Sequence, residues 1–198
     1  MIQAGSVGAP YIPVLGLAGT DLLKRRDDMK ILPDPFNPDR KTVVAKAYRP
    51  DFAIFHAQKA DRQGNVSSGW NNDDTLLAEA ARHVIVTVEE VVEHLEEKDA
   101  TGSFLPGILV NTVVHAPFGA HPAGCPDYYA VDSEHMKHYA EQSISDEAFQ
   151  SYLEETTFSV SSHEEYVERF VPAEWRQAGA AAGGVTAGGV TAGRRDSA

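Results

Sequence analysis

The stretch Asp51-Phe-Ala-Ile-Phe-His-Ala57 decides the fold, because its apolar residues follow one another without alternation. The consecutive apolar residues 53–55 are typical of a strand that is buried on both faces, as in a parallel sheet. Val84-Ile-Val-Thr-Val88 is a second such run and is rich in β-branched residues. Ile108-Leu-Val-Asn-Thr-Val-Val114 predicts a third strand.

Helical patterns separate these runs. Asn71-Asn-Asp73 offers helix caps, and Thr75-Leu-Leu-Ala-Glu-Ala-Ala-Arg82 consists of good helix formers. Glu89 and Glu90 precede apolar residues at helical spacing, which indicates a second helix with two acids in its first turn. This alternation predicts an α/β fold, a mostly parallel sheet with helices on its faces.

The two ends of the chain differ from this pattern. Such a sheet usually opens with a strand and a Gly-rich turn into a helix, whereas this chain opens on a Gly- and Pro-rich stretch. We therefore expect the N-terminal part of the usual domain to be missing. Residues 133–142 and 145–155 predict amphipathic helices, and Ser162-His-Glu-Glu165 is a capping box that opens a last helix. We expect a partial domain over residues 1–176 and a disordered Gly/Ala-rich tail over residues 177–198, where GGVTA repeats.

Charge and composition limit the function classes. The net charge is −12, yet residues 1–62 hold ten Lys/Arg against seven Asp/Glu. An acidic chain is a poor non-specific nucleic-acid binder, and a phosphate-bearing ligand is expected nearer the basic first third. We see no secretory signal and no apolar run of membrane-spanning length, so we expect neither a membrane nor a nucleic-acid partner. A single cysteine excludes an internal disulfide and fits a cytoplasmic protein.

Candidate pocket residues follow from the strands. Ligands of open parallel sheets bind beyond the C-terminal ends of the strands. This rule selects the segment from His56 to Asn65, the pair Glu89-Glu90, and the segment from His115 to Pro122. We expect these three segments to meet on one rim of the sheet. The candidates are His56, Gln58, Asp61, Gly64, Asn65, Glu89, Phe118, Gly119, Ala120 and His121.

Some candidates also have a structural interpretation. His56 can donate to a backbone carbonyl and hold a loop, and Asp61 can pair with Arg62 or cap a turn. Glu89 is favourable at a helix start without any chemistry. His121, before a proline, fits a surface turn. Around Phe118, in contrast, a glycine lets backbone amides approach a ligand, as an oxyanion or thioester carbonyl requires.

Two further chemistries are disfavoured. His121, Cys125, His135 and His138 fit no common zinc spacing, so we expect no metal site. Cys125 lies in a flexible loop with no evident base beside it, which argues against a thiol nucleophile.

Four stretches carry a resemblance to a known family. They are Gly8-Ala-Pro-Tyr-Ile-Pro-Val with Leu17-Ala-Gly-Thr-Asp21; Pro50-Asp-Phe-Ala-Ile-Phe-His-Ala-Gln-Lys-Ala-Asp-Arg-Gln-Gly-Asn65; Ala80-Ala-Arg-His-Val-Ile-Val-Thr-Val-Glu-Glu90; and Pro117-Phe-Gly-Ala-His-Pro122. Together they resemble the C-terminal portion of the A (alpha) subunit of family I CoA-transferases, the glutaconate CoA-transferase type. A related group that hydrolyses CoA thioesters in steroid-ring degradation shares them.

The resemblance implies a two-subunit enzyme that moves CoA between an acyl-CoA and a carboxylic acid. Its catalytic glutamate belongs to the other, B-type subunit, so this chain is expected to supply pocket walls and no catalytic residue. The expected partners are the B-type CoA-transferase subunit, acyl-CoA and a separate N-terminal piece of the A-type subunit. Coenzyme A is expected as a substrate, with no permanently bound cofactor. The alternatives are a thioester hydrolase subunit of the same fold and an inactive truncated remnant.

Overall fold

The chain forms two compact units, and the computed structural model describes residues 1–69 and 73–182. The first unit comprises Met1–Ile54 and Asn71–Ile85. The second comprises Phe55–Trp70 and Val86–Ala198. No helix within the described ranges is long and apolar enough to cross a membrane.

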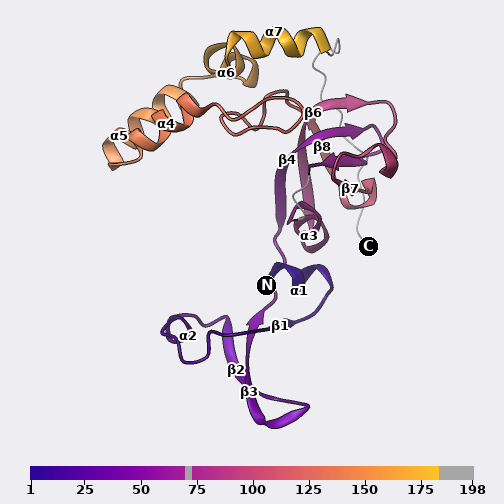
Figure 1. The fold of residues 1–198 in the computed structure, drawn as a ribbon, viewed down its shortest axis with the longest axis vertical. Coiled ribbons are helices and arrows are strands. Elements are labelled where there is room, and N and C mark those ends of the chain that lie inside the picture. The colour runs from indigo at the N-terminus through magenta and orange to yellow at the C-terminus, as the bar shows by residue number, and fades with distance from the viewer. Residues whose placement is uncertain (70–72, 183–198) are drawn as a thin grey trace. The chain divides into compact units, whose positions relative to one another are not determined.

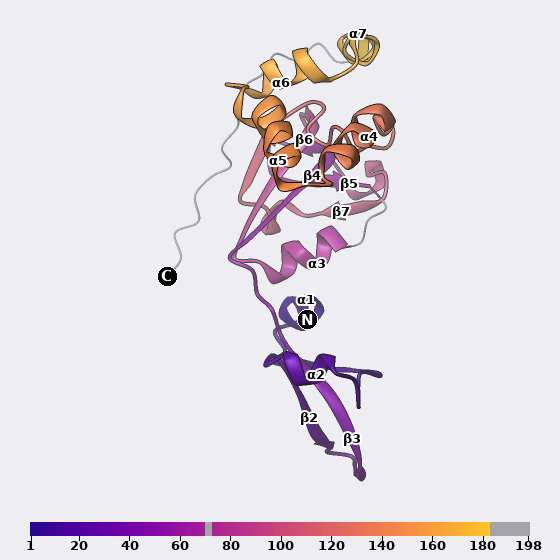
Figure 2. The same ribbon diagram turned by 90° about the vertical axis from the view of Figure 1, so that its left-hand side faces the viewer.

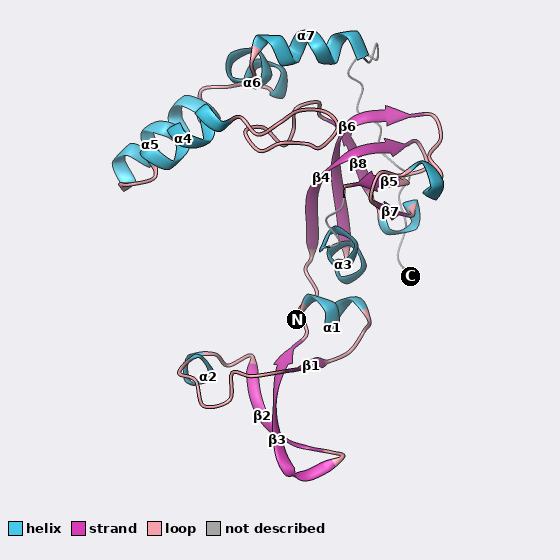
Figure 3. Ribbon diagram, viewed as in Figure 1, coloured by secondary structure: helices cyan, strands magenta, loops and turns pink. Residues whose placement is uncertain are grey.

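The first unit holds a small antiparallel sheet that the sequence patterns did not predict. Its strand order is β1-β3-β2, and β3 pairs with both neighbours, Val44 facing Pro13 on one side and Lys30 on the other. Figure 3 shows β2 and β3 as a long hairpin. The strands are β1 (Tyr11–Val14), β2 (Met29–Asp34) and β3 (Asn37–Lys46), and the helices are α1 (Ile2–Ser6), α2 (Leu22–Arg25) and α3 (Asp73–Ala80).

The second sheet has the strand order β7-β5-β4-β6-β8. Its strands are β4 (Phe52–Asp61), β5 (Val66–Ser68), β6 (His83–Val92), β7 (Ser103–Leu105) and β8 (Thr112–His115). Phe52 stacks on His83, and His56 contacts Thr87. The residue numbers differ by 31 in both pairs, and this constant offset means that β4 and β6 run parallel. Because β5 is antiparallel to both β4 and β7, the sheet is mixed. The expected α/β class with parallel central strands is confirmed.

The predicted strand limits need correction. β4 continues to Asp61, so most of the segment from His56 to Asn65 is strand and only its end is a turn. β6 continues to Val92, so the expected helix start at Glu89 and Glu90 is wrong. Neighbouring segments donate hydrogen bonds to the carboxylate of Glu89. These bonds compensate for its burial, so the acid can occupy a position within a buried strand.

The third predicted strand is shorter than expected and begins later. A 3-10 turn, η2 (Gly107–Leu109), precedes β8. A Cβ on Gly107 would lie 2.2 Å from the carbonyl oxygen of Gln63. The backbone at Gly107 is therefore so close to the turn after β4 that only glycine fits at this position. A second 3-10 turn, η1 (Glu97–Asp99), follows β6.

Three of the C-terminal helices agree with the sequence patterns, whereas α7 (Ala173–Ala182) is an additional helix after the one expected to be last. The three are α4 (Ser133–Gln142), α5 (Asp146–Leu153) and α6 (His163–Phe170), and a π-helical turn η3 (Glu154–Phe158) follows α5. The predicted cap is present, since the Ser162 side chain accepts from the amide of Glu165. Figures 1 and 2 show α6 and α7 at the same end of the second unit as α4 and α5. The predicted tail boundary at residue 177 falls within α7, and residues 183–198 lie outside the described residues.

Asp61 closes the turn that ends β4. Its side chain is almost fully buried, and its two oxygens accept from the amides of Gln63, Asn65 and Leu95 and from the Asn65 side chain. Gly64 has a φ of +85°, which fits glycine. Asn65 in turn accepts from the amide of Gly107 at 2.9 Å. Asp61 therefore acts as a brace that connects three segments.

We expect Asp61→Ala to lower the free energy of unfolding by about 3 kcal/mol, because several buried donors lose a charged acceptor. Urea denaturation followed by circular dichroism measures this. Glu93→Ala, at a side chain that is 88% exposed, is the control and should change stability by less than about 0.5 kcal/mol. Equal effects of the two substitutions would contradict the role of Asp61.

Candidate functional site

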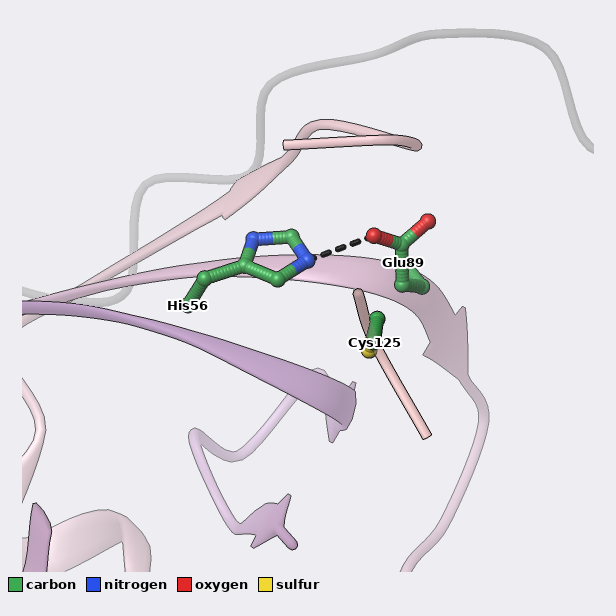
Figure 4. A group of neighbouring side chains, drawn as sticks. All are labelled: His56, Glu89 and Cys125. Carbon is green, nitrogen blue, oxygen red and sulfur yellow. Dashed lines mark hydrogen bonds and ion pairs between the residues drawn. The ribbon is translucent and has the colours of Figure 1, made fainter. Parts of the chain in front are cut away.

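Glu89 lies at the centre of the site. Its side chain is 3% exposed. One carboxylate oxygen lies 2.5 Å from Nε2 of His56 and 2.6 Å from the hydroxyl of Tyr129, and the other accepts from the amide of Phe118 at 2.7 Å. Figure 4 shows the His56 ring pointing at this carboxylate. Three donors compensate the burial of the acid.

His56 reaches Glu89 because β4 and β6 are parallel neighbours. Side chains alternate along β6, so Thr87 and Glu89 lie on the same face of the sheet. Nδ1 of His56 is 2.8 Å from the Thr87 hydroxyl while Nε2 meets Glu89, so both ring nitrogens have partners. The pair can hold a proton at a fixed position between an imidazole and a carboxylate.

The turn after β8 is tightly held against this pair. Phe118 has a φ of +62°, and a Cβ on Gly119 would lie 2.8 Å from the His56 ring. The amides of Phe118 and Ala120 donate to Glu89 and to the Tyr129 hydroxyl, respectively. The amides of Gly119 and His121 donate to backbone carbonyls of the same turn. An oxyanion or thioester carbonyl at this turn would therefore have to displace an existing partner.

Sequence reasoning missed Tyr129. Its hydroxyl donates to Glu89 and accepts from the amide of Ala120, so it links the buried acid to the turn. Burial, followed by the hydrogen bond to Glu89, raises the pKa of Tyr129 and keeps it protonated. Tyr129 lies 40 positions after Glu89, and no periodic pattern in the sequence relates the two residues.

The remaining candidates divide into separate groups. Gln58 is buried and donates to the carbonyl of Pro126 at 3.0 Å. Asp61, Gly64 and Asn65 form the turn brace described above. The structure therefore brings together His56, Glu89, Phe118, Gly119 and Ala120. That these residues line a ligand pocket stays a prediction.

His121 contacts a different set of side chains. Its own side chain is fully buried, so the interpretation as a surface turn is wrong. Nδ1 lies 2.9 Å from the hydroxyl of Tyr166, and Nε2 lies 3.2 Å from Asp132. Burial, followed by the charge of His121, lowers the pKa of His135, whose ring packs edge-on against that of His121.

Cys125 lies close to the central pair. Its sulfur, one oxygen of Glu89 and one ring nitrogen of His56 lie within 4.8 Å of one another (Figure 4). Burial, together with the charges of Glu89 and Asp127, raises the pKa of Cys125 to about 12. The thiol is therefore protonated at neutral pH, which disfavours a role as nucleophile.

A family model described as Coenzyme A transferase matches residues 1–116. The chain is also 33% identical to the A-type subunit of the glutaconate CoA-transferase of Acidaminococcus fermentans, over 85% of this chain and 58% of the relative. The chain belongs to the coenzyme A transferase family. The crystal structure of glutaconate coenzyme A-transferase from that organism matches the fold with a TM-score of 0.80, over 88% of this chain and 60% of the matched chain. The CoA-transferase type of α/β fold is thereby confirmed.

Two other relatives are named for different activities. The A-type subunit of the 3-oxoadipate CoA-transferase of Pseudomonas knackmussii is 34% identical over 77% of this chain and 54% of the relative. The cholesterol ring-cleaving hydrolase IpdA subunit of Rhodococcus jostii is 30% identical over 83% of this chain and 58% of the relative. The chain spans about half the length of the curated relatives that it matches.

We expect Tyr129→Phe to lower the free energy of unfolding by about 2 kcal/mol, since the Ala120 amide and the Glu89 carboxylate both lose a buried partner. Tyr128→Phe is a matched control. Its hydroxyl makes an exposed hydrogen bond to Glu90, so its removal should change stability by less than about 1 kcal/mol. Thermal or urea unfolding distinguishes the two. A larger loss for Tyr128→Phe would contradict the role of Tyr129 as a link.

The raised pKa of Cys125 predicts that its thiol reacts slowly with electrophiles. At pH 8 we expect a thiol-specific disulfide reagent to label the folded chain at least about a hundred-fold more slowly than the unfolded chain, in which the pKa is about 8.5. The measurement compares labelling rates with and without guanidinium. Equal rates would show that Cys125 is neither buried nor protonated as described.

Proposed function

We propose that this chain serves as the A-type subunit, or part of it, of a two-subunit CoA-transferase that moves CoA between an acyl-CoA and a carboxylic acid. The observation that carries the proposal is the match to the A-type subunit of glutaconate CoA-transferase, in sequence at 33% identity and in fold at a TM-score of 0.80. Relatives that are themselves one subunit of a CoA-transferase support a B-type subunit as the partner. We propose a cytoplasmic enzyme with CoA as substrate and no permanently bound cofactor.

In this proposal the nucleophilic glutamate is on the B-type subunit. It attacks the acyl-CoA thioester to give an acyl-glutamate anhydride and the CoA thiolate, and the thiolate then attacks the glutamyl carbonyl to form a glutamyl-CoA thioester and release the donor carboxylate. The acceptor carboxylate attacks this thioester to give a second anhydride and the CoA thiolate, which attacks the acceptor acyl carbonyl to form the new acyl-CoA and restore the glutamate. Glu89 is poorly suited to that role. Its side chain is 3% exposed, and its oxygens are occupied by three donors. A carboxylate in such a setting is held in place and shielded from substrate, which supports a nucleophile supplied by the partner.

We propose that the turn from Phe118 to His121 forms a wall of the acyl-CoA pocket and that Glu89 and His56 hold this wall in place. The amide of Phe118 is bonded to Glu89, and Gly119 lies against the His56 ring. A wall that is fixed by a buried acid keeps its position when substrate binds. Such positioning contributes to rate because misplacement by about 1 Å can cost roughly a hundred-fold.

A second candidate function is hydrolysis of a CoA thioester. The 30% identity to a ring-cleaving hydrolase subunit favours it as the alternative. The two reactions differ in their acceptor. A transferase needs a carboxylic acid to accept CoA, whereas a hydrolase releases CoA and acid with water alone.

Co-expression tests the proposal. The chain is produced with a B-type partner and, where the genome supplies it, with the remaining part of the A-type subunit, and the purified complex is incubated with an acyl-CoA and a panel of carboxylic acids. We expect a new acyl-CoA to form only when an acceptor acid is present. Release of free CoA without an acceptor would favour the hydrolase. A complex that shows neither reaction with any acid would contradict both proposals and favour an inactive remnant.

In the active complex we expect Gly119→Ala to lower kcat/KM by at least about ten-fold, because the added Cβ displaces the His56 ring and the turn with it. Gly69→Ala is the matched control, since a Cβ there meets no atom within 4 Å among the described residues. It should leave kcat/KM within about two-fold of the parent. Unchanged activity in folded Gly119→Ala would show that the turn does not line the pocket.

A further inference from the structure

A second polar cluster lies apart from the Glu89 group and consists of His121, Asp132 and His135. Each of the three offers one ligand atom, and these atoms lie within 4.8 Å of one another. His121 belongs to the loop between β8 and α4, Asp132 is the N-cap of α4, and His135 lies in its first turn. Loop and helix therefore meet at one point through side chains that are strong ligands for metal ions.

The two carboxylate oxygens of Asp132 have different partners. Its Oδ1 accepts from the amide of His135 at 2.9 Å and so caps the helix, while its Oδ2 faces Nε2 of His121 at 3.2 Å. The side chain is 13% exposed, and that of His121 is fully buried. The capping bond orients the carboxylate and leaves the second oxygen directed at the imidazole. A ligand oxygen is thus held in position by the helix itself.

Each of the two histidines has a tyrosine hydroxyl beside one of its ring nitrogens. Nδ1 of His121 lies 2.9 Å from the hydroxyl of Tyr166 in α6, and Nε2 of His135 lies 3.0 Å from the hydroxyl of Tyr152 in α5. A histidine that binds a metal commonly donates its other ring N–H to such an acceptor, which fixes its tautomer and ring orientation. For His121 this arrangement leaves Nε2, the nitrogen beside Asp132, as the one that binds.

Aromatic rings surround the cluster. The ring of Trp175 lies 6.5 Å from that of His121, and the ring of Phe170 lies 6.0 Å from that of His135. Such a shell limits water access and strengthens the attraction between a cation and a carboxylate. Arginine and lysine are also absent from the hydrogen bonds and ion pairs described for these three residues.

We propose that His121, Asp132 and His135 bind one divalent cation of the zinc class and that the ion fastens the loop after β8 to α4. Two imidazoles and one carboxylate form a ligand set that suits Zn²⁺, and water completes its coordination. The nitrogen that binds must be unprotonated, so any proton on Nε2 of His121 passes to solvent when the ion binds. The proposal does not depend on the proposed transferase function.

The cluster of His56, Glu89 and Cys125 is a weaker candidate for the same ion. Both oxygens of Glu89 already accept hydrogen bonds, including one from a backbone amide. Cys125 is buried and would have to lose its proton in the neighbourhood of that carboxylate. A metal bound by His56, Glu89 and Cys125 would disrupt the hydrogen bonds that hold the turn after β8. A metal bound by His121, Asp132 and His135 would replace at most one proton, that on Nε2 of His121.

The test is a zinc titration of the full chain after treatment with a chelator, at pH 7.5 and with a competing fluorescent indicator. We expect one Zn²⁺ per chain and a rise in Tm with zinc. Asp132→Asn should weaken binding by at least about ten-fold, while asparagine preserves the helix cap. His135→Gln should also weaken it by at least about ten-fold. Far-UV circular dichroism verifies that both variants are folded.

Two control variants make the test decisive. His138→Gln changes a histidine of the same helix that is 43% exposed, and it should leave the affinity within about two-fold of the parent. Cys125→Ser should also leave it unchanged. Absence of binding by the parent chain at micromolar zinc would overturn the proposal. Loss of binding in Cys125→Ser but not in folded Asp132→Asn would equally overturn it, in favour of the other cluster.

Discussion

The second unit depends on the burial of one negative charge. Glu89 sits within a strand and is shielded from water, so its carboxylate needs donors from the protein. These come from β4 through His56, from the turn after β8 through Phe118, and from the following loop through Tyr129. Removal of any one of these donors leaves a buried charge with less compensation, so the three segments are held together by a common electrostatic requirement.

This requirement also explains the form of the candidate site. The turn from Phe118 to His121 is held by its own amides and by the absence of a side chain at Gly119. A surface of this kind is rigid and carries no exposed nucleophile. It suits a protein that shapes a pocket while a partner supplies the reacting group, which is the division of labour that we propose for this member of the coenzyme A transferase family.

The loop from β8 to α4 joins two polar centres. Tyr129 bonds to Glu89, while His121 in the same loop bonds to Asp132 and Tyr166. The ring of Trp175 lies 6.0 Å from that of Tyr129 and 6.5 Å from that of His121, so one indole packs against both centres. A cation at His121 would therefore stabilise the loop that supplies a donor to Glu89.

The sequence by itself determined what depends on neighbours along the chain: the central strands, α4 and the Ser162 cap of α6, because continuous apolar runs and capping residues act within a few positions. Tertiary structure alone decided that β6 continues through Glu89, that Tyr129 belongs to the site, and that His121 is buried beside Asp132. The partners of the Glu89 carboxylate lie 29 to 40 residues away along the chain. Whether a carboxylate begins a helix or is buried in a strand depends on donors that reach it only when the chain has folded.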